Sequence, residues 1–166
     1  MIREIRLFGD PVLLEHAADV ASIGPEEIAV LDDMTDTMRA HKCVGLSAPQ
    51  IGVSKRLFIV DAGGVFIRGA NPEILSEGAL CEDLEGSPCL PGVAHRPVRR
   101  PKKIVCRYLS EEGMVECELK GIAARAFCHE KDHHEGILFI DRLKPIQRRM
   151  AVKEFEAYCR NQNTHN

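Results

Sequence analysis

The most suggestive chemistry in the sequence lies in a five-residue segment, His129-Glu130-Lys131-Asp132-His133, which matches the pattern H-E-x-x-H. On a helix, the two imidazoles stand four residues apart on one face, where they can share a metal ion. Glu130 would then lie beside the ion and move protons instead of binding it. The alternative is a surface helix that carries His and acidic residues by chance.

A catalytic metal needs a third protein ligand, with one position left open for water or substrate. Metzincin proteases supply a third histidine, but Phe139 occupies that position here. A gluzincin protease would use a downstream glutamate, for which Glu154 and Glu156 are available. Cys89 is a better candidate, because residues 85–92 form a short, proline-bounded, non-helical stretch that can present a thiolate.

The elements that must position these residues follow from hydrophobic periodicity and from turn residues. Helices are predicted over residues 25–40, 122–133 and 145–160. Hairpins are predicted for residues 56–60 with 65–67 and for residues 104–109 with 114–119. We expect Asn71-Pro72 to break the chain and Gly136 to stop the second helix. The pattern indicates an α+β fold with mainly antiparallel sheets around a central metal-binding helix, and a helix near each end.

Length and composition bound the remaining possibilities. With 166 residues and 45% hydrophobic residues, we expect one catalytic domain over residues 1–160 and a polar tail over 161–166. The formal charge of −3 argues against a dedicated DNA or RNA binder. No apolar run approaches the roughly 18 residues of a membrane span, and the charged start is unlike a signal peptide. Seven cysteines argue against a disulfide framework, so we expect a cytoplasmic protein.

Three segments, taken in order, resemble the signature motifs of the peptide deformylase family. They are Gly45-Leu-Ser-Ala-Pro-Gln50, then Glu85-Gly86 with Cys89-Leu90 close by, then His129-Glu-x-Asp-His133. The Asp10-Pro-Val-Leu-Leu start and the segment Gly136-Ile-Leu-Phe-Ile-Asp-Arg142 also look like that family. The resemblance covers nearly the whole chain to about residue 145.

This resemblance implies a metallohydrolase that removes the formyl group from the N-terminal formyl-methionine of nascent polypeptides. Fe²⁺ is the usual native metal of the family, with Zn²⁺, Ni²⁺ or Co²⁺ as substitutes. The expected ligands are Cys89, His129 and His133, whose donor set accepts Fe²⁺ and Zn²⁺ alike. Glu130 is expected to take a proton from water and to return it to the leaving amine.

The family pattern also suggests how the oxyanion and the substrate are held. It assigns the oxyanion donors to the side-chain amide of Gln50 and the backbone N–H of Leu90. Gly45 suits the close approach of a peptide backbone. Further family positions line the methionine pocket, with core packing as the alternative, and are Val44, Ile122 and Ala126.

The middle segment departs from the usual family motif Glu-Gly-Cys-Leu-Ser-x-Pro-Gly. Ser87 stands where a gapless match expects cysteine, and Cys89 comes two residues later. Because alternate residues of an extended stretch face the same side, Cys89 can still reach the metal after a small shift. Cys81 remains a rival ligand.

Two neighbours of the histidines have open roles. Asp132 either orients a ligand histidine from behind it or is a solvated carboxylate. His134 points to another helix face, so we expect it to be exposed or hydrogen-bonded instead of binding metal.

Two other functions stay open at this point. One is a binding or regulatory protein on the deformylase fold with altered activity, and the other is a zinc peptidase of the H-E-x-x-H type. The last predicted helix adds a possible partner, because some bacterial deformylases contact the ribosome near the exit tunnel. Its basic residues are Arg148, Arg149, Lys153 and Arg160. The alternative is a helix that only packs through Phe155 and Tyr158.

Overall fold

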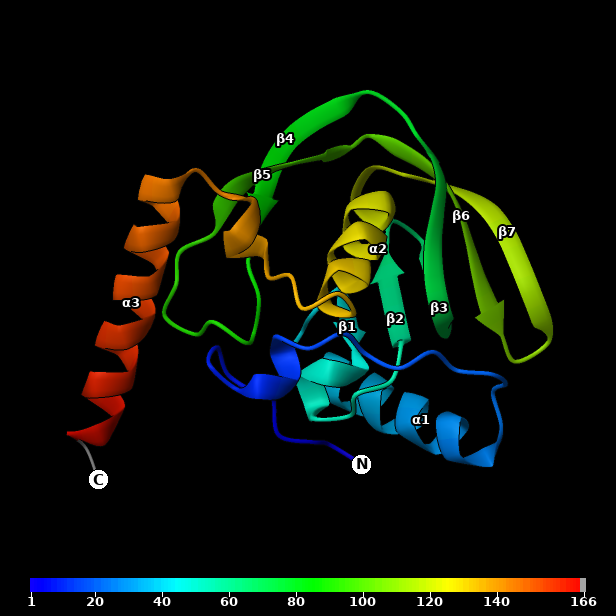
Figure 1. The fold of residues 1–166 in the computed structure, drawn as a ribbon, viewed down its shortest axis with the longest axis horizontal. Coiled ribbons are helices and arrows are strands. Elements are labelled where there is room, and N and C mark those ends of the chain that lie inside the picture. The colour runs from blue at the N-terminus through cyan, green and yellow to red at the C-terminus, as the bar shows by residue number, and fades with distance from the viewer. Residues whose placement is uncertain (165–166) are drawn as a thin grey trace.

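The computed structural model describes residues 1–164 (Figure 1). The α-helices in this part of the chain are α1 (Pro25–Ala40), α2 (Gly121–His133) and α3 (Pro145–Asn163). Short 3₁₀ turns are η1 (Pro11–Leu13), η2 (Ala48–Ile51) and η3 (Phe139–Arg142). The strands are β1 (Gly45–Ser47), β2 (Leu57–Ala62), β3 (Val65–Glu77), β4 (Leu80–Glu85), β5 (Arg96–Pro101), β6 (Lys103–Ser110) and β7 (Gly113–Lys120).

The strands form two antiparallel sheets around α2. The larger sheet has the order β1-β2-β3-β6-β7, and β4 pairs with β5 in the smaller one. Figure 1 shows α2 at the centre, with β4 and β5 arching over it and α3 standing at the side of the molecule. This arrangement confirms the expected α+β fold with a central helix.

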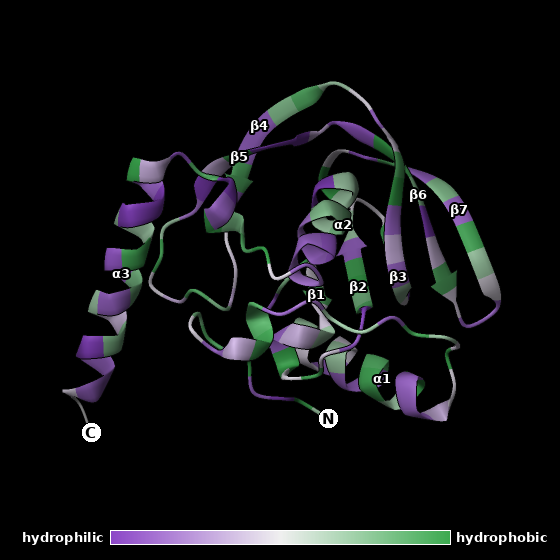
Figure 2. Cartoon of the chain, in the orientation of Figure 1, coloured by the Kyte–Doolittle hydropathy of each residue, from purple (hydrophilic) through white to green (hydrophobic). Residues whose placement is uncertain are grey.

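Strand β2 separates two apolar clusters. Leu57 and Ile59 face the first cluster, whereas Phe58 and Val60 face the second, as the alternation of a strand requires. The ring of Phe58 makes edge-to-face contact with Phe127 of α2, with centroids 5.2 Å apart. Figure 2 shows the resulting run of hydrophobic residues along β2. Both faces of this strand are therefore buried, and α2 is anchored against it.

The helix predictions are confirmed, with one change at the end of the chain. Helix α1 spans the predicted residues, and Glu27 accepts a hydrogen bond from the Gly24 backbone at 3.1 Å at its start. Gly136 follows α2 with φ +71°, a conformation that suits glycine and ends the helix. Helix α3 runs to Asn163, three residues into the segment expected to be a polar tail. Residues 165–166 of that segment lie outside the described residues.

The predicted hairpins form, but the predicted break at Asn71-Pro72 is wrong. Strand β3 continues through both residues, with a shift in its pairing to β6 between Ala70 and Glu73. Asn71 takes a left-handed conformation with φ +50°, and its side chain exchanges hydrogen bonds with the Val20 backbone at 2.7 and 2.9 Å. The strand bulges there instead of ending, because an asparagine tolerates this conformation.

Strands β4 and β5 were not expected from the sequence. Strand β5 reads Arg-Pro-Val-Arg-Arg-Pro, a composition that disfavours strands, although prolines fit at the edge of a sheet. Its buried positions are Arg96, Val98 and Arg100, on alternate residues, and the terminal Pro101, so two of the four are charged. Among residues 1–164, no helix has the length and apolar character needed to cross a bilayer.

Candidate metal centre

Helix α2 brings the two motif histidines together. His129 and His133 are both buried, and their Nε2 atoms lie 3.2 Å apart. Two nitrogen ligands of one tetrahedral ion, each at about 2.0–2.1 Å, would be separated by roughly 3.3 Å. Burial keeps the pKa of His133 well below its usual value, so this imidazole is neutral and can bind a metal. The pair therefore has the spacing that a shared metal requires, and His133 has the neutral form that binds it.

Glu85 holds His129 from behind. Its Oε1 atom lies 2.9 Å from Nδ1 of His129, which directs Nε2 of the same ring toward His133. Burial alone would raise the pKa of Glu85, but hydrogen bonds from His129 and Arg100 outweigh it and lower this pKa below its usual range. The carboxylate is therefore ionised and orients the ring. Burial also opposes the charged form of His129, yet Glu85 and Glu130 outweigh it and raise the pKa of His129.

Arg100 of β5 connects this carboxylate to a second one. It donates two hydrogen bonds to Glu85 at 3.0 Å and one to Asp132 at 2.6 Å. Arg142 also donates to both oxygens of Asp132, at 2.6 and 3.0 Å. Asp132 is buried in this network and does not face solvent. It supports His129 indirectly, through Arg100 and Glu85.

Glu130 is buried on the same helix, against the backbone of β1. An added Cβ at Gly45 would lie 2.5 Å from Glu130 Oε1, so this position admits only glycine without displacing the carboxyl group. The Oε2 atom has no hydrogen-bond partner. Burial raises the pKa of Glu130 to about 7, which suits a group that accepts and returns protons near neutral pH.

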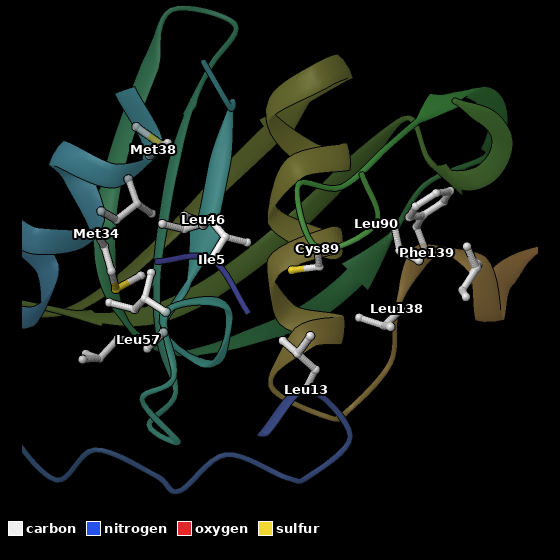
Figure 3. Close-up of a cluster of buried hydrophobic side chains, with 14 of the residues drawn as sticks. Ile5, Leu13, Met34, Met38, Leu46, Leu57, Cys89, Leu90, Leu138 and Phe139 are labelled. Atoms are coloured by element: carbon white, nitrogen blue, oxygen red, sulfur yellow. The ribbon is translucent and has the colours of Figure 1, made fainter. Parts of the chain in front are cut away.

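Cys89 lies on the loop between β4 and β5. It is fully buried in the first apolar cluster, and Figure 3 shows it on this loop beside α2. Its thiol accepts a hydrogen bond from Gln50 Nε2 at 3.5 Å, and burial raises its pKa to about 11. The charge of Glu130 contributes to this rise, so the thiol stands within electrostatic reach of the motif carboxyl group.

The alternative third ligands are placed differently. Ser87 lies on the cavity wall, and its hydroxyl accepts a hydrogen bond from the Cys89 backbone at 3.3 Å. The Cys81 thiol accepts one from Arg125 at 3.7 Å. Glu154, on α3, forms an ion pair with Arg96 of β5 at 2.6 Å. Of the candidates, Cys89 alone is joined to another expected site residue by a sulfur contact.

Across residues 1–164, no three His, Cys, Asp or Glu side chains already stand close enough together to hold a metal ion. The two imidazoles have the required spacing, and Cys89, the expected third donor, lies on the β4–β5 loop beside α2. One sulfur and two nitrogen donors with a fourth position open is a donor set suited to a divalent transition metal. The residues therefore fit such an ion.

The two expected oxyanion donors differ in their availability. Gln50 is buried, and its Oε1 atom accepts from the backbone and hydroxyl of Ser47 at 2.7 and 3.0 Å. This arrangement fixes its amide nitrogen toward Cys89. The Leu90 N–H already donates to the Ser87 carbonyl at 3.1 Å, in a tight turn. Gln50 is thus preorganised as a donor, whereas Leu90 is engaged in the loop.

A cavity of about 470 Å³ opens beside Glu130 and His129. All four expected substrate-binding residues lie on its wall: Val44, Gly45, Ile122 and Ala126. Val44 and Ile122 are about half exposed, so they belong to the cavity and not to the core. Gln50 and Leu90 line the same space. Cys89 and His133 are not on this wall.

His134 is buried and is not part of this site. Its Nε2 atom lies 2.8 Å from the carbonyl oxygen of Leu57 in β2, and burial lowers its pKa to about 4. It therefore links the end of α2 to the sheet, in agreement with the expectation of a hydrogen-bonded histidine.

Comparison with known proteins decides the family. Residues 2–149 match the family model described as polypeptide deformylase. A peptide deformylase of Caldanaerobacter subterraneus subsp. tengcongensis is 44% identical over 144 residues, which cover 86% of this chain and 89% of the relative. The chain belongs to the polypeptide deformylase family. Its activity is that of a peptide deformylase, the removal of the N-formyl group from nascent polypeptides, and the family implies a divalent metal ion.

Solved structures agree with this assignment to the deformylases. A peptide deformylase from Legionella pneumophila superposes with a TM-score of 0.90 at 36% identity, covering 98% of each chain. The deformylase from Thermus thermophilus gives a TM-score of 0.87 at 38% identity, covering 96% of this chain and 99% of that one. The fold around α2 is therefore the deformylase fold, including the arching pair β4 and β5.

Sequence reasoning missed the ionic support of the deformylase site. Glu85 belongs to the middle motif, which indicates no contact with His129, and Arg100 lies outside all three motifs. Arg125 also donates to Glu85, at 2.7 Å. The available signal was the position of Arg100, two residues after Val98 in a short segment, which is the spacing of side chains on one face of a strand.

Proposed function

We propose that this chain deformylates formyl-methionine at the start of nascent polypeptides, with one divalent metal held by Cys89, His129 and His133. The observation that carries the proposal is the buried imidazole pair, with Nε2 atoms 3.2 Å apart, beside a cavity that contains Glu130. We propose Fe²⁺ as the native ion, with Zn²⁺, Ni²⁺ or Co²⁺ as substitutes, because thiolate and imidazole donors suit all of them.

Glu130 is the proton carrier in this proposal. The bound metal would supply a Lewis acid that lowers the pKa of water near it. Glu130, whose Oε2 atom has no other partner, takes the proton from the attacking water and returns it to the leaving amine. Because Gly45 has no side chain, the substrate can approach its backbone, and the Glu130 carboxyl group is not displaced.

Gln50 stabilises the negative charge that develops on the formyl oxygen. Its carbonyl end is held by Ser47, so its amide hydrogens are directed without further reorganisation. The Leu90 N–H joins as a second donor when the turn that it closes with Ser87 opens. The methionine side chain occupies the apolar wall formed by Val44, Ile122 and Ala126.

Formate release and metal content, measured together, test this proposal. The wild-type protein should release formate from a short formyl-methionyl peptide and hold one metal per chain. Cys89→Ala should lose both properties, whereas Glu130→Gln should keep the metal and lose most turnover. Cys159→Ala, a half-buried cysteine on α3, is the matched control and should keep both.

Three results would contradict parts of the proposal. If Cys89→Ala keeps its full metal content and Cys81→Ala or Ser87→Ala loses the metal, the third metal ligand is Cys81 or Ser87 and not Cys89. Equal loss of metal in Glu130→Gln would make Glu130 a ligand. Cleavage of internal peptide bonds without formate release would indicate a zinc peptidase, and metal binding without either reaction would indicate a regulatory protein.

We further propose that residues 1–160 act as one catalytic domain in the cytoplasm and that α3 contacts the ribosome near the exit tunnel. Arg149 and Lys153 lie along α3 with the exposed side chains of Ile146 and Met150. Arg148, the residue before Arg149, pairs with Asp141 at 3.0 Å and is partly exposed. A basic surface on an acidic protein favours contact with a polyanion such as ribosomal RNA.

Charge reversal tests the contact between α3 and the ribosome. Arg148→Glu, Arg149→Glu and Lys153→Glu together should weaken salt-sensitive co-sedimentation with ribosomes and leave cleavage of a short formyl peptide unchanged. Lys120→Glu, on an exposed lysine of β7, is the control. If the wild-type protein does not co-sediment, or if reversal has no effect, α3 serves only to pack through Phe155, whose ring lies 5.6 Å from that of Phe8.

A further inference from the structure

A pair of cysteines faces the second apolar cluster, away from the proposed metal ligands. Cys106 of β6 and Cys117 of β7 are directly opposite each other in the register of the two strands. Their sulfur atoms lie 3.7 Å apart. Neither residue lines the catalytic cavity. The two thiols are in contact and have no role in the proposed reaction.

The backbone of this pair suits a disulfide. Directly opposite residues of antiparallel strands have Cα atoms about 4.5 or 5.5 Å apart, depending on the hydrogen-bonding position. Disulfides form between Cα atoms roughly 4.4–6.8 Å apart, with a bond of about 2.05 Å. Side-chain rotation can therefore bring the sulfurs together without moving the strands apart or changing their register.

The two thiols differ in accessibility. Cys106 is fully buried, and burial raises its pKa to about 12. Cys117 is only partly buried, and β7 is the edge strand of the sheet (Figure 1). A small oxidant can reach Cys117 first, because Cys106 is fully buried. A third thiol, Cys128 of α2, is buried in the same cluster.

We propose that Cys106 and Cys117 form a reversible disulfide through exchange with a small-molecule disulfide such as oxidised glutathione. The Cys117 thiolate attacks one sulfur of the small disulfide, forming a mixed disulfide and expelling one thiolate. Cys106 then loses its proton and attacks the Cys117 sulfur, which releases the second thiol. Two protein thiols are oxidised, and one small disulfide is reduced to two thiols.

The bond would staple the hairpin that leads into the metal-binding helix. Strand β7 ends at Lys120, and α2 begins at the next residue. A cross-link between β6 and β7 restricts the unfolded chain, so the oxidised protein should unfold at a higher temperature. Reduction with dithiothreitol should restore the original midpoint.

Peptide mapping of the metal-loaded protein tests the proposal without any substitution. After exposure to oxidised glutathione, free thiols are alkylated and the chain is digested with trypsin. Cleavage after Arg107 separates the two cysteines, so the disulfide should join peptides 104–107 and 108–120, with a loss of two hydrogen atoms. The Cys117→Ser variant should lack this species and the rise in midpoint, and Cys159→Ser should keep both.

Three outcomes would overturn the proposal. One is a stable glutathione adduct on Cys117 with no cross-linked peptide. Another is a cross-link from peptide 104–107 to peptide 126–131, which would pair Cys106 with Cys128. The third is full alkylation of Cys106 and Cys117 after oxidation. Because the mapping uses the wild-type chain, poor folding of a variant would not obscure the result.

Discussion

Replacing Gly45 by alanine tests whether catalysis depends on the position of the Glu130 carboxyl group. The added Cβ would lie 2.5 Å from Oε1 and 3.1 Å from the Cδ and Cγ atoms of Glu130. Ordinary contact begins at 3.4 Å, so the oxygen must retreat by the difference, about 0.9 Å. A displacement of about 1 Å can cost on the order of 100-fold in rate. We expect kcat for formate release to fall by about that factor, with metal content unchanged.

A matched control and a double variant make this prediction sharper. Gly24→Ala adds a methyl group that meets only Glu27 Oε2, at 3.6 Å, so activity should stay at the wild-type level. Glu130→Asp shortens the side chain by one methylene, and as a single variant it should lose activity. In the Gly45→Ala background its further effect should be much smaller, because both changes displace the same group. Wild-type kcat in Gly45→Ala, or parallel loss of metal, would refute the reasoning.

Further predictions concern the support of the site. Arg100→Met removes the arginine that joins the buried carboxylates of Glu85 and Asp132, although Arg125 and Arg142 still donate to them. It should lower the free energy of unfolding by about 3 kcal/mol in urea titrations, the lower end of the range for a broken buried ion pair. Arg107→Met is the control, because Arg107 forms an exposed pair with Glu73, and it should lower the free energy of unfolding by only about 0–1 kcal/mol. Equal losses of stability in the two variants would contradict the prediction. Gln50→Ala should lower kcat by about 10²–10³-fold with metal retained, and an unchanged kcat would remove Gln50 from the oxyanion site. Glu154→Gln should bind metal as the wild type does, since Glu154 pairs with Arg96. Loss of metal in this variant would indicate that Glu154 is a metal ligand.

The sequence was sufficient to predict the elements whose patterns are local. Helix α1 follows from a proline at its first position and from apolar residues at helical spacing. The two histidines need only a helix to meet, because their spacing places them on one face. The turn between β2 and β3 contains Gly63 and Gly64 with positive φ, which two adjacent glycines adopt without strain.

Features that depend on distant contacts could not be predicted in the same way. Asn71 continues β3 because its side chain binds the Val20 backbone, 51 residues away in the sequence. Arg100 of β5 donates to Glu85 of β4 and Asp132 of α2, and Arg96 pairs with Glu154 of α3, so a strand with two buried arginines is stabilised by carboxylates from other elements. Local propensity holds no information on such partners, and tertiary contacts overrule it.

The most direct measurement is a diffraction map collected at the absorption edge of the metal in the metal-loaded protein. We expect one peak per chain, bound by Nε2 of His129 and His133, with the Cys89 sulfur about 2.3 Å away. Glu130 should lie near the peak without binding it. A peak bound by Ser87 or by the Cys81 sulfur, or one in which Glu130 completes the ligand set, would contradict the proposed centre.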